Sequence, residues 1–122
     1  MRGFTHGLAS LMLVALSPTP ASLQNAPAAE VQVVNVSAER FSFTPSEIRV
    51  KAGVRLELRL RSDDTAHGFR IVGTDIDIEL PKRGRGTMTV VFEPKAGRYT
   101  FECSQLCGAG HEFMRGVIIA TE

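Results

Sequence analysis

Short stretches in which apolar and polar residues alternate make up most of the chain after residue 30. In Val54–Ser62, apolar residues occupy the even positions up to Leu60, and charged residues lie between them. Successive side chains of a β-strand point to opposite faces, so this pattern predicts a strand with one face on a core and the other in water. Val31–Ser37 shows the same alternation.

Residues that break strands recur between further stretches of this kind. Pro and Gly residues stand at positions 45, 53, 73, 81, 94 and 97, where turns are expected. Together with the absence of a helical period, this spacing predicts an all-β fold built as a two-sheet sandwich. The strand periodicity also predicts that Met88 lies in the core. The additional predicted strands are Glu47–Val50, Gly68–Val72, Ile76–Leu80, Thr87–Phe92, Arg98–Cys103 and Gly116–Thr121.

The first 30 residues differ from the rest. Arg2 precedes a short apolar run, Leu8–Leu16, and a Pro-, Ala- and Ser-rich stretch follows it. This order is typical of a secretory signal peptide, cleaved after Ala21 or after Ala28. We therefore expect a signal peptide over residues 1–21 or 1–28, a flexible linker up to residue 30 and one domain over residues 31–122. A retained membrane anchor is the alternative, although the run is shorter than a spanning helix needs.

Charge excludes one class of partner. The chain has 14 Lys and Arg and 13 Asp and Glu, and removal of the leader takes away only Arg2. A nearly neutral chain with no basic cluster is not expected to bind nucleic acid. Neither a nucleophile with an acid-His relay nor a phosphate-binding glycine loop is present, so a hydrolase is also not expected.

One segment does not fit the strand pattern. Ser104–Phe113 lacks alternation and contains Gly108 and Gly110, yet it lies between two predicted strands. A loop of this length usually has a function, because ordering it costs conformational entropy.

This loop and its flanks contain soft metal donors. Cys103, Cys107, His111 and Met114 supply two thiols, an imidazole and a thioether within twelve residues. Such donors favour copper or zinc over ions that prefer oxygen. His67 is a second imidazole, which only the fold could bring to the loop.

Four interpretations account for these residues to different extents. A Cys103–Cys107 disulfide is permitted by export, and a tetrahedral zinc site would use two Cys and two His. A mononuclear blue-copper site would use His67, Cys107, His111 and an axial Met114 but not Cys103. A pair of copper ions bridged by both thiolates would use all five side chains, with Met114 and a loop carbonyl in the outer positions.

At these residues the sequence closely resembles the CuA domain of cytochrome c oxidase subunit II. The family pattern is an upstream His followed by C-x-x-x-C-x-x-x-H-x-x-M, which this chain matches from His67 to Met114. The resemblance extends to the stretches DxxHGF, FxFxPxxI, GTxxD and GxYxFxC. It implies a cupredoxin-like Greek-key sandwich, two copper ions and a ligand role for the backbone carbonyl of Gln105. Asp64 is expected to orient His67, although a plain polar turn is the alternative.

The chain also departs from the family. Many relatives have Glu at the position of Gln105, and many have a surface Trp where this chain has none; Phe41, Phe43 or the apolar rim at Phe113 could replace it. The transmembrane hairpin that normally fixes subunit II to its oxidase is not predicted in these 122 residues. We therefore expect an exported, periplasmic carrier of single electrons, or an electron-entry component that is not catalytic alone. A c-type cytochrome or a terminal oxidase would be its partner. The alternatives are a copper chaperone or storage protein that delivers Cu(I) for oxidase assembly, and a mononuclear blue-copper carrier.

Overall fold

The computed structural model describes residues 3, 7, 14–18 and 30–122 of the chain. The predicted signal peptide and linker fall almost entirely outside the described residues, so both remain predictions. Within the described part, no helix has the length and apolar character needed to cross a membrane.

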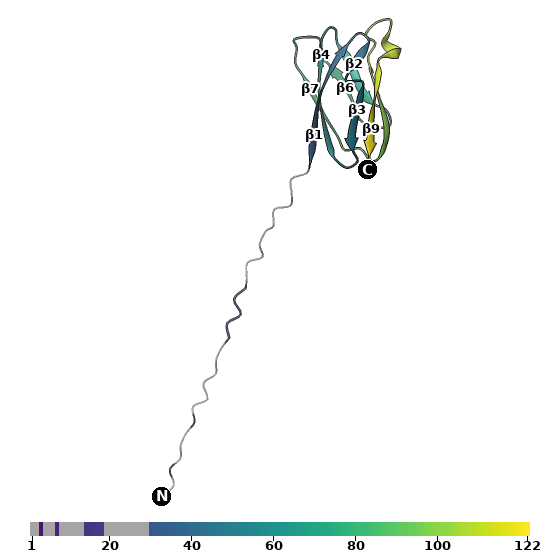
Figure 1. Cartoon of the computed structure of the whole chain (residues 1–122). Helices are drawn as coiled ribbons and strands as arrows, with labels where there is room; N and C mark the ends of the chain where they lie inside the picture. The colour runs from purple at the N-terminus through teal and green to yellow at the C-terminus, as the bar shows by residue number, and fades with distance from the viewer. Residues whose placement is uncertain (1–2, 4–6, 8–13, 19–29) are drawn as a thin grey trace.

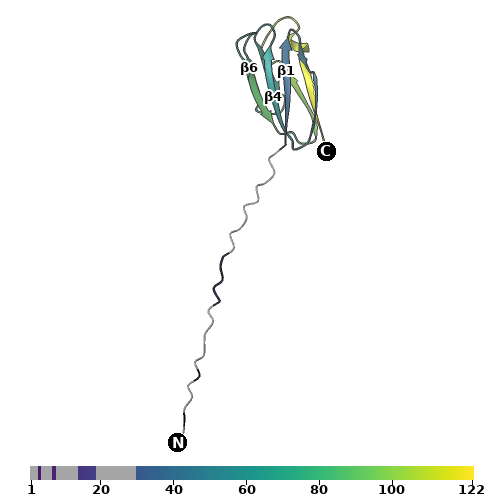
Figure 2. The same cartoon turned by 60° about the vertical axis from the view of Figure 1, so that its left-hand side comes forward.

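Residues 31–122 form a sandwich of two β-sheets (Figures 1 and 2). One sheet has the strand order β2-β1-β4-β7 and the other β3-β9-β8-β5-β6. The pairs β1/β4 and β3/β9 are parallel, and the other pairs are antiparallel. The strands are β1 (Val31–Glu39), β2 (Ser42–Thr44), β3 (Glu47–Lys51), β4 (Arg55–Ser62), β5 (His67–Ile71), β6 (Asp77–Leu80), β7 (Met88–Phe92), β8 (Gly97–Glu102) and β9 (Arg115–Thr121). A single 3-10 turn, η1 (His111–Phe113), precedes β9.

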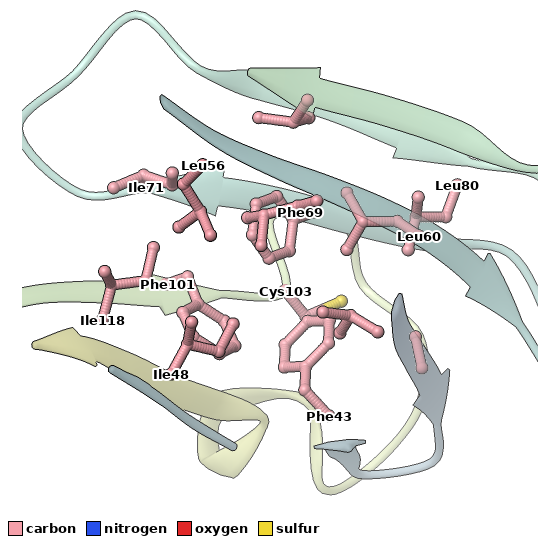
Figure 3. Close-up of a cluster of buried hydrophobic side chains, with 14 of the residues drawn as sticks. Phe43, Ile48, Leu56, Leu60, Phe69, Ile71, Leu80, Phe101, Cys103 and Ile118 are labelled. Carbon is pink, nitrogen blue, oxygen red and sulfur yellow. The ribbon is translucent and has the colours of Figure 1, made fainter. Parts of the chain in front are cut away.

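The alternating pattern explains how the sheets pack. Leu56, Leu58 and Leu60 of β4 are fully buried, and the charged residues between them face outward. Beneath Ser104–Phe113, the ligand loop, the rings of Phe43 and Phe101 lie 5.4 Å apart in an edge-on arrangement. Phe69 completes this aromatic cluster, and Figure 3 shows Cys103 beside it. The loop between β8 and β9 therefore rests on a rigid, tightly packed base.

The all-β sandwich predicted from the sequence is confirmed, with two local corrections. Strand β2 was not predicted, because three residues are too few to show an alternating pattern. The prediction that Met88 lies in the core is wrong, since its side chain is 37% exposed. Met88 begins β7, which is an edge strand, so only one neighbouring strand covers it.

Two chain segments meet at one end of the sandwich. The connection between β8 and β9 contains η1, and in Figure 1 it lies at the end opposite the C-terminus and the start of β1. β5 begins at this same end with His67. The topology thus gathers the predicted ligands at one pole.

Candidate metal centre

Two neighbouring strands hold the ends of the ligand loop. Cys103 follows β8 directly and Met114 precedes β9 directly. The amide of Cys103 donates to the carbonyl of Met114 at 3.0 Å, which extends the antiparallel ladder by one more pair. The first and last predicted ligands are therefore positioned by the sheet, and only the residues between them depend on the loop.

His67 reaches the loop from the strand on the other side of β8. It is fully buried at the start of β5, which pairs with β8. The next residue, Gly68, lets the two segments approach, because a Cβ atom there would lie 2.6 Å from the Gln105 amide nitrogen. The Gly68 amide also donates to the Cys103 sulfur at 3.4 Å.

The two cysteine sulfurs form the middle of the centre. They lie 3.5 Å apart and both cysteines are free and buried, so no disulfide joins them. Two donors bound to one ion by bonds of about 2.0–2.3 Å can be separated by no more than about 4.6 Å. The Cys103 sulfur lies 4.0 Å from Nδ1 of His67, and the Cys107 sulfur lies 3.6 Å from Nδ1 of His111 and 3.8 Å from the Met114 sulfur. The donor set therefore fits soft metal ions.

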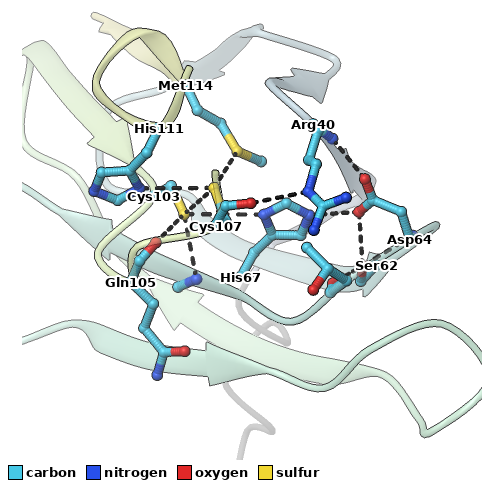
Figure 4. A network of polar contacts seen from close by, with 11 residues as sticks. Arg40, Ser62, Asp64, His67, Cys103, Gln105, Cys107, His111 and Met114 are labelled. Atoms are coloured by element: carbon cyan, nitrogen blue, oxygen red, sulfur yellow. Dashed lines mark hydrogen bonds and ion pairs between the residues drawn. The ribbon is translucent and has the colours of Figure 1, made fainter. Parts of the chain in front are cut away.

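The two imidazoles lie on opposite sides of the sulfur pair (Figure 4). The donor atoms of His67, Cys103 and Cys107 all lie within 4.8 Å of one another, and His111 is outside this group. The Met114 sulfur lies 3.8 Å from the Cys107 sulfur, and the Gln105 carbonyl oxygen lies 3.0 Å from the Cys103 sulfur. Each sulfur thus has one imidazole and one weaker donor beside it.

Gln105 faces the centre through its backbone. Its carbonyl oxygen accepts a hydrogen bond from the Cys103 thiol at 3.0 Å. The side-chain amide points away from the sulfurs in Figure 4. The identity of the side chain therefore matters little for this contact, which any residue at this position could make.

Asp64 contacts the His67 ring on the side that faces away from the sulfurs. Its Oδ1 lies 2.6 Å from Nε2 of His67, and its Oδ2 accepts a hydrogen bond from the Arg40 amide at 2.9 Å. The Asp64 amide donates to the Ser62 hydroxyl. Asp64 is thus part of a polar turn and also contacts the imidazole. With Nε2 occupied by Asp64, the Nδ1 atom of His67 is the nitrogen that faces the sulfurs.

Burial and hydrogen bonds shift the pKa values of two groups at this site. Burial and the adjacent Cys103 thiol raise the pKa of the Cys107 thiol to about 11. Burial opposes ionisation of Asp64, but hydrogen bonds from Arg40 and His67 outweigh it and lower the pKa of this carboxyl group. The metal-free Cys107 thiol therefore holds its proton at neutral pH, and a metal that binds the thiolate must displace that proton.

Sequence reasoning did not find every residue at this site. Nε of Arg40 donates to the Cys107 carbonyl at 2.9 Å, although 67 residues separate the two. The Phe41 ring packs against Gly108 and Gly110, where a Cβ atom would approach it to 2.8 Å and 2.4 Å. The FxFxPxxI motif includes Phe41, but nothing in its pattern connects it to the ligand loop.

The loop also presents apolar side chains to solvent. Phe113, next to Met114, is 77% exposed, and Leu106, next to Cys107, is 87% exposed. His111 is partly exposed, whereas His67 is fully buried. The outer surface of the centre is therefore its His111 side.

Known proteins share this fold and up to a third of the aligned residues. Residues 7–120 match the Cupredoxin-like domain family. Cytochrome c oxidase subunit 2 of Thermus thermophilus is 33% identical over 105 residues, which cover 86% of this chain and 76% of that protein. A structure of a heme-copper terminal oxidase dimer contains a chain with 26% identity and a TM-score of 0.65, over 85% of this chain and 76% of the other.

A further solved structure shows the same fold at lower identity. The periplasmic domain of subunit II of cytochrome oxidase from Bradyrhizobium japonicum has 19% identity and a TM-score of 0.66, over 74% of this chain and 83% of that domain. The Cys and His donors and these relatives together support copper binding and copper-based electron transfer. The chain belongs to the cupredoxin-like domain family and, within it, to the family of cytochrome c oxidase subunit 2.

Proposed function

We propose that this domain holds two copper ions as a CuA-type centre and transfers single electrons. The observation that carries the proposal is the placement of the imidazoles on opposite sides of two sulfurs that are 3.5 Å apart. A mononuclear site on His67, Cys107, His111 and Met114 would give no role to the buried Cys103 thiol, whose sulfur lies 3.5 Å from that of Cys107. A single tetrahedral zinc ion would need all four donors close together, and His111 lies outside the close group.

Cys103 and Cys107 would bind both ions, and His67 and His111 would each complete one of them. Met114 and the Gln105 carbonyl would take the weak outer positions, one on each ion. A copper pair that shares two thiolates supplies a delocalised electron, so its oxidation changes little in its geometry. The chain contributes the rigidity, because β5, β8 and β9 fix three of the ligands.

The partner we propose is a c-type cytochrome as donor, a terminal oxidase as acceptor, or both. The 33% identity to an oxidase subunit and the exposed apolar residues of the ligand loop support this choice. An exported, periplasmic location fits the predicted leader and a relative that is described as a periplasmic domain. We propose no catalytic reaction for this chain by itself.

Delivery of Cu(I) during oxidase assembly is the competing function. A delivery protein would need a ligand that an acceptor can reach, and the burial of His67, Cys103, Cys107 and Met114 argues against it.

Metal analysis with EPR spectroscopy of the copper-loaded protein tests the proposal. Two coppers per chain and a mixed-valent signal shared by both ions are expected. One blue copper per chain would replace the proposal with a mononuclear carrier. Colourless Cu(I) that a chelator removes rapidly would favour delivery, and zinc retention or a disulfide in the working state would reject copper chemistry.

A further inference from the structure

We propose that Arg40 is a positioning residue that fixes the middle of the ligand loop, at Cys107, to the His67–Asp64 pair. The proposal rests on the proposed copper centre for its consequences, but the contacts belong to the metal-free protein. Arg40 lies in the turn between β1 and β2, outside the strands that carry the ligands.

Arg40 contacts both halves of the centre. Its backbone amide donates to Oδ2 of Asp64, whose other oxygen contacts His67. Its side-chain Nε donates to the Cys107 carbonyl at 2.9 Å. Figure 4 shows Arg40 between Asp64 and Cys107, with both contacts drawn. One residue therefore joins the β5 side of the centre to the middle of the loop.

A second contact at the adjacent residue strengthens this attachment. The Phe41 ring lies so close to Gly108 and Gly110 that neither position has room for a Cβ atom. Residues 40 and 41 thus hold Cys107–Gly110 by a polar and an apolar contact. The stretch they hold lies between Cys107 and His111, where no strand supports the backbone.

The bond to the Cys107 carbonyl involves a charged donor, and hydrogen bonds of this kind are stronger than those between neutral groups. Without it, the loop should open more often while the sandwich stays folded. The Arg40 backbone contact to Asp64 does not depend on the side chain. Arg40 substitutions therefore test the loop attachment and leave the support of His67 in place.

Amide hydrogen exchange of the reduced, metal-free protein, measured by NMR, is the first test. The amides of His111 and Met114 make hydrogen bonds within the loop, and the Val117 amide bonds to Ser46 outside it. Arg40→Ala should speed exchange at His111 and Met114 about tenfold and leave Val117 unchanged. Arg40→Lys keeps the charge but lacks Nε–H, and should fall between Arg40→Ala and the wild type.

Arg98→Ala is the matched control, because it removes an exposed arginine from the start of β8, away from the loop. It should leave all three amides unchanged. Unaltered loop exchange in Arg40→Ala would overturn the proposal, as would equal acceleration at Val117, which would indicate a role in the whole fold. If Arg40→Ala does not fold, Arg40→Gln takes its place with the same expected outcomes.

Copper removal from the loaded protein by a Cu(I) chelator is the second test. Arg40→Ala should lose copper about tenfold faster than the wild type at unchanged stoichiometry, and Arg98→Ala should match the wild type. An unchanged rate would overturn the link to the metal centre. A wild type that binds no copper would reject the proposed function, while the exchange experiment would still decide the role of Arg40.

Discussion

Nε2 of His67 lies 2.6 Å from Oδ1 of Asp64, and the opposite nitrogen of the same ring faces the Cys103 sulfur. This carboxylate contact fixes both the tautomer and the orientation of the imidazole. Residues that support metal ligands in this way typically change metal affinity by about 10–100-fold when they are mutated.

Asp64→Asn should therefore lower copper affinity about 10–100-fold without unfolding the protein. The neutral amide holds the imidazole less firmly than the carboxylate does. Competition with a Cu(I) chelator measures the effect. Asp63→Asn is the control, because Asp63 pairs with Arg61 rather than with His67. Equal affinities for Asp64→Asn and the wild type would show that Asp64 is only a turn residue.

Cys103→Ser should abolish the mixed-valent EPR signal, because the second bridging sulfur is lost. Cys107 keeps His111 and Met114 within 3.6 Å and 3.8 Å, so one copper can remain. EPR with metal analysis measures both changes. A spectrum identical to that of the wild type would remove Cys103 from the ligand set.

Met114→Leu should retain two coppers and raise the reduction potential. Leu has a similar volume to this fully buried Met, so packing is preserved. Loss of the thioether donor destabilises the oxidised pair, which carries the higher charge, and so raises the reduction potential. Both ions should stay bound, because a weak axial ligand tunes a copper centre more than it binds it. Voltammetry measures the shift in reduction potential. Loss of copper from the variant would show instead that Met114 is needed to bind the metal.

Gly68→Ala should destabilise the protein by about 1–3 kcal/mol, the usual cost of overpacking, and should also lower copper affinity. The new methyl group would lie 2.2 Å from the Ser104 hydroxyl oxygen and 2.6 Å from the Gln105 amide nitrogen. Thermal unfolding and chelator competition measure the two effects.

The double variant Gly68→Ala/Ser104→Ala tests the cause of that destabilisation. Removing the Ser104 hydroxyl cannot relieve the contact with the Gln105 backbone, so the double variant should remain impaired. Full recovery would show that only the flexible side chain was in the way.

Phe113→Ser should slow electron exchange with a c-type cytochrome while leaving stability and the copper spectrum unchanged. The side chain is 77% exposed beside Met114, so its loss removes apolar contact surface without disturbing the core. Stopped-flow kinetics measures the rate. Val72→Ser is the control, because Val72 is also exposed but follows the far end of β5. Equal rates in the two variants would place the docking surface elsewhere.

Much of the fold could be predicted from the sequence, because a strand with one buried face alternates apolar and polar residues. Leu56, Leu58 and Leu60 were assigned to the core on this basis, and the structure confirms it. Met88 obeys the same period but begins an edge strand. Its exposure depends on which strand lies beside it, and a local pattern cannot show this.

The donor chemistry could be predicted from local sequence, because the soft donors from Cys103 to Met114 lie in one segment and their spacing matches a known family pattern. The distances between donors depend on the fold: the pairing of β5 with β8 brings His67 to the sulfurs, and the turn after β1 brings Arg40 to Cys107. The reason is that local sequence sets which atoms can bind a metal, whereas contacts across 36 and 67 residues arise only when the sheets assemble around a common core.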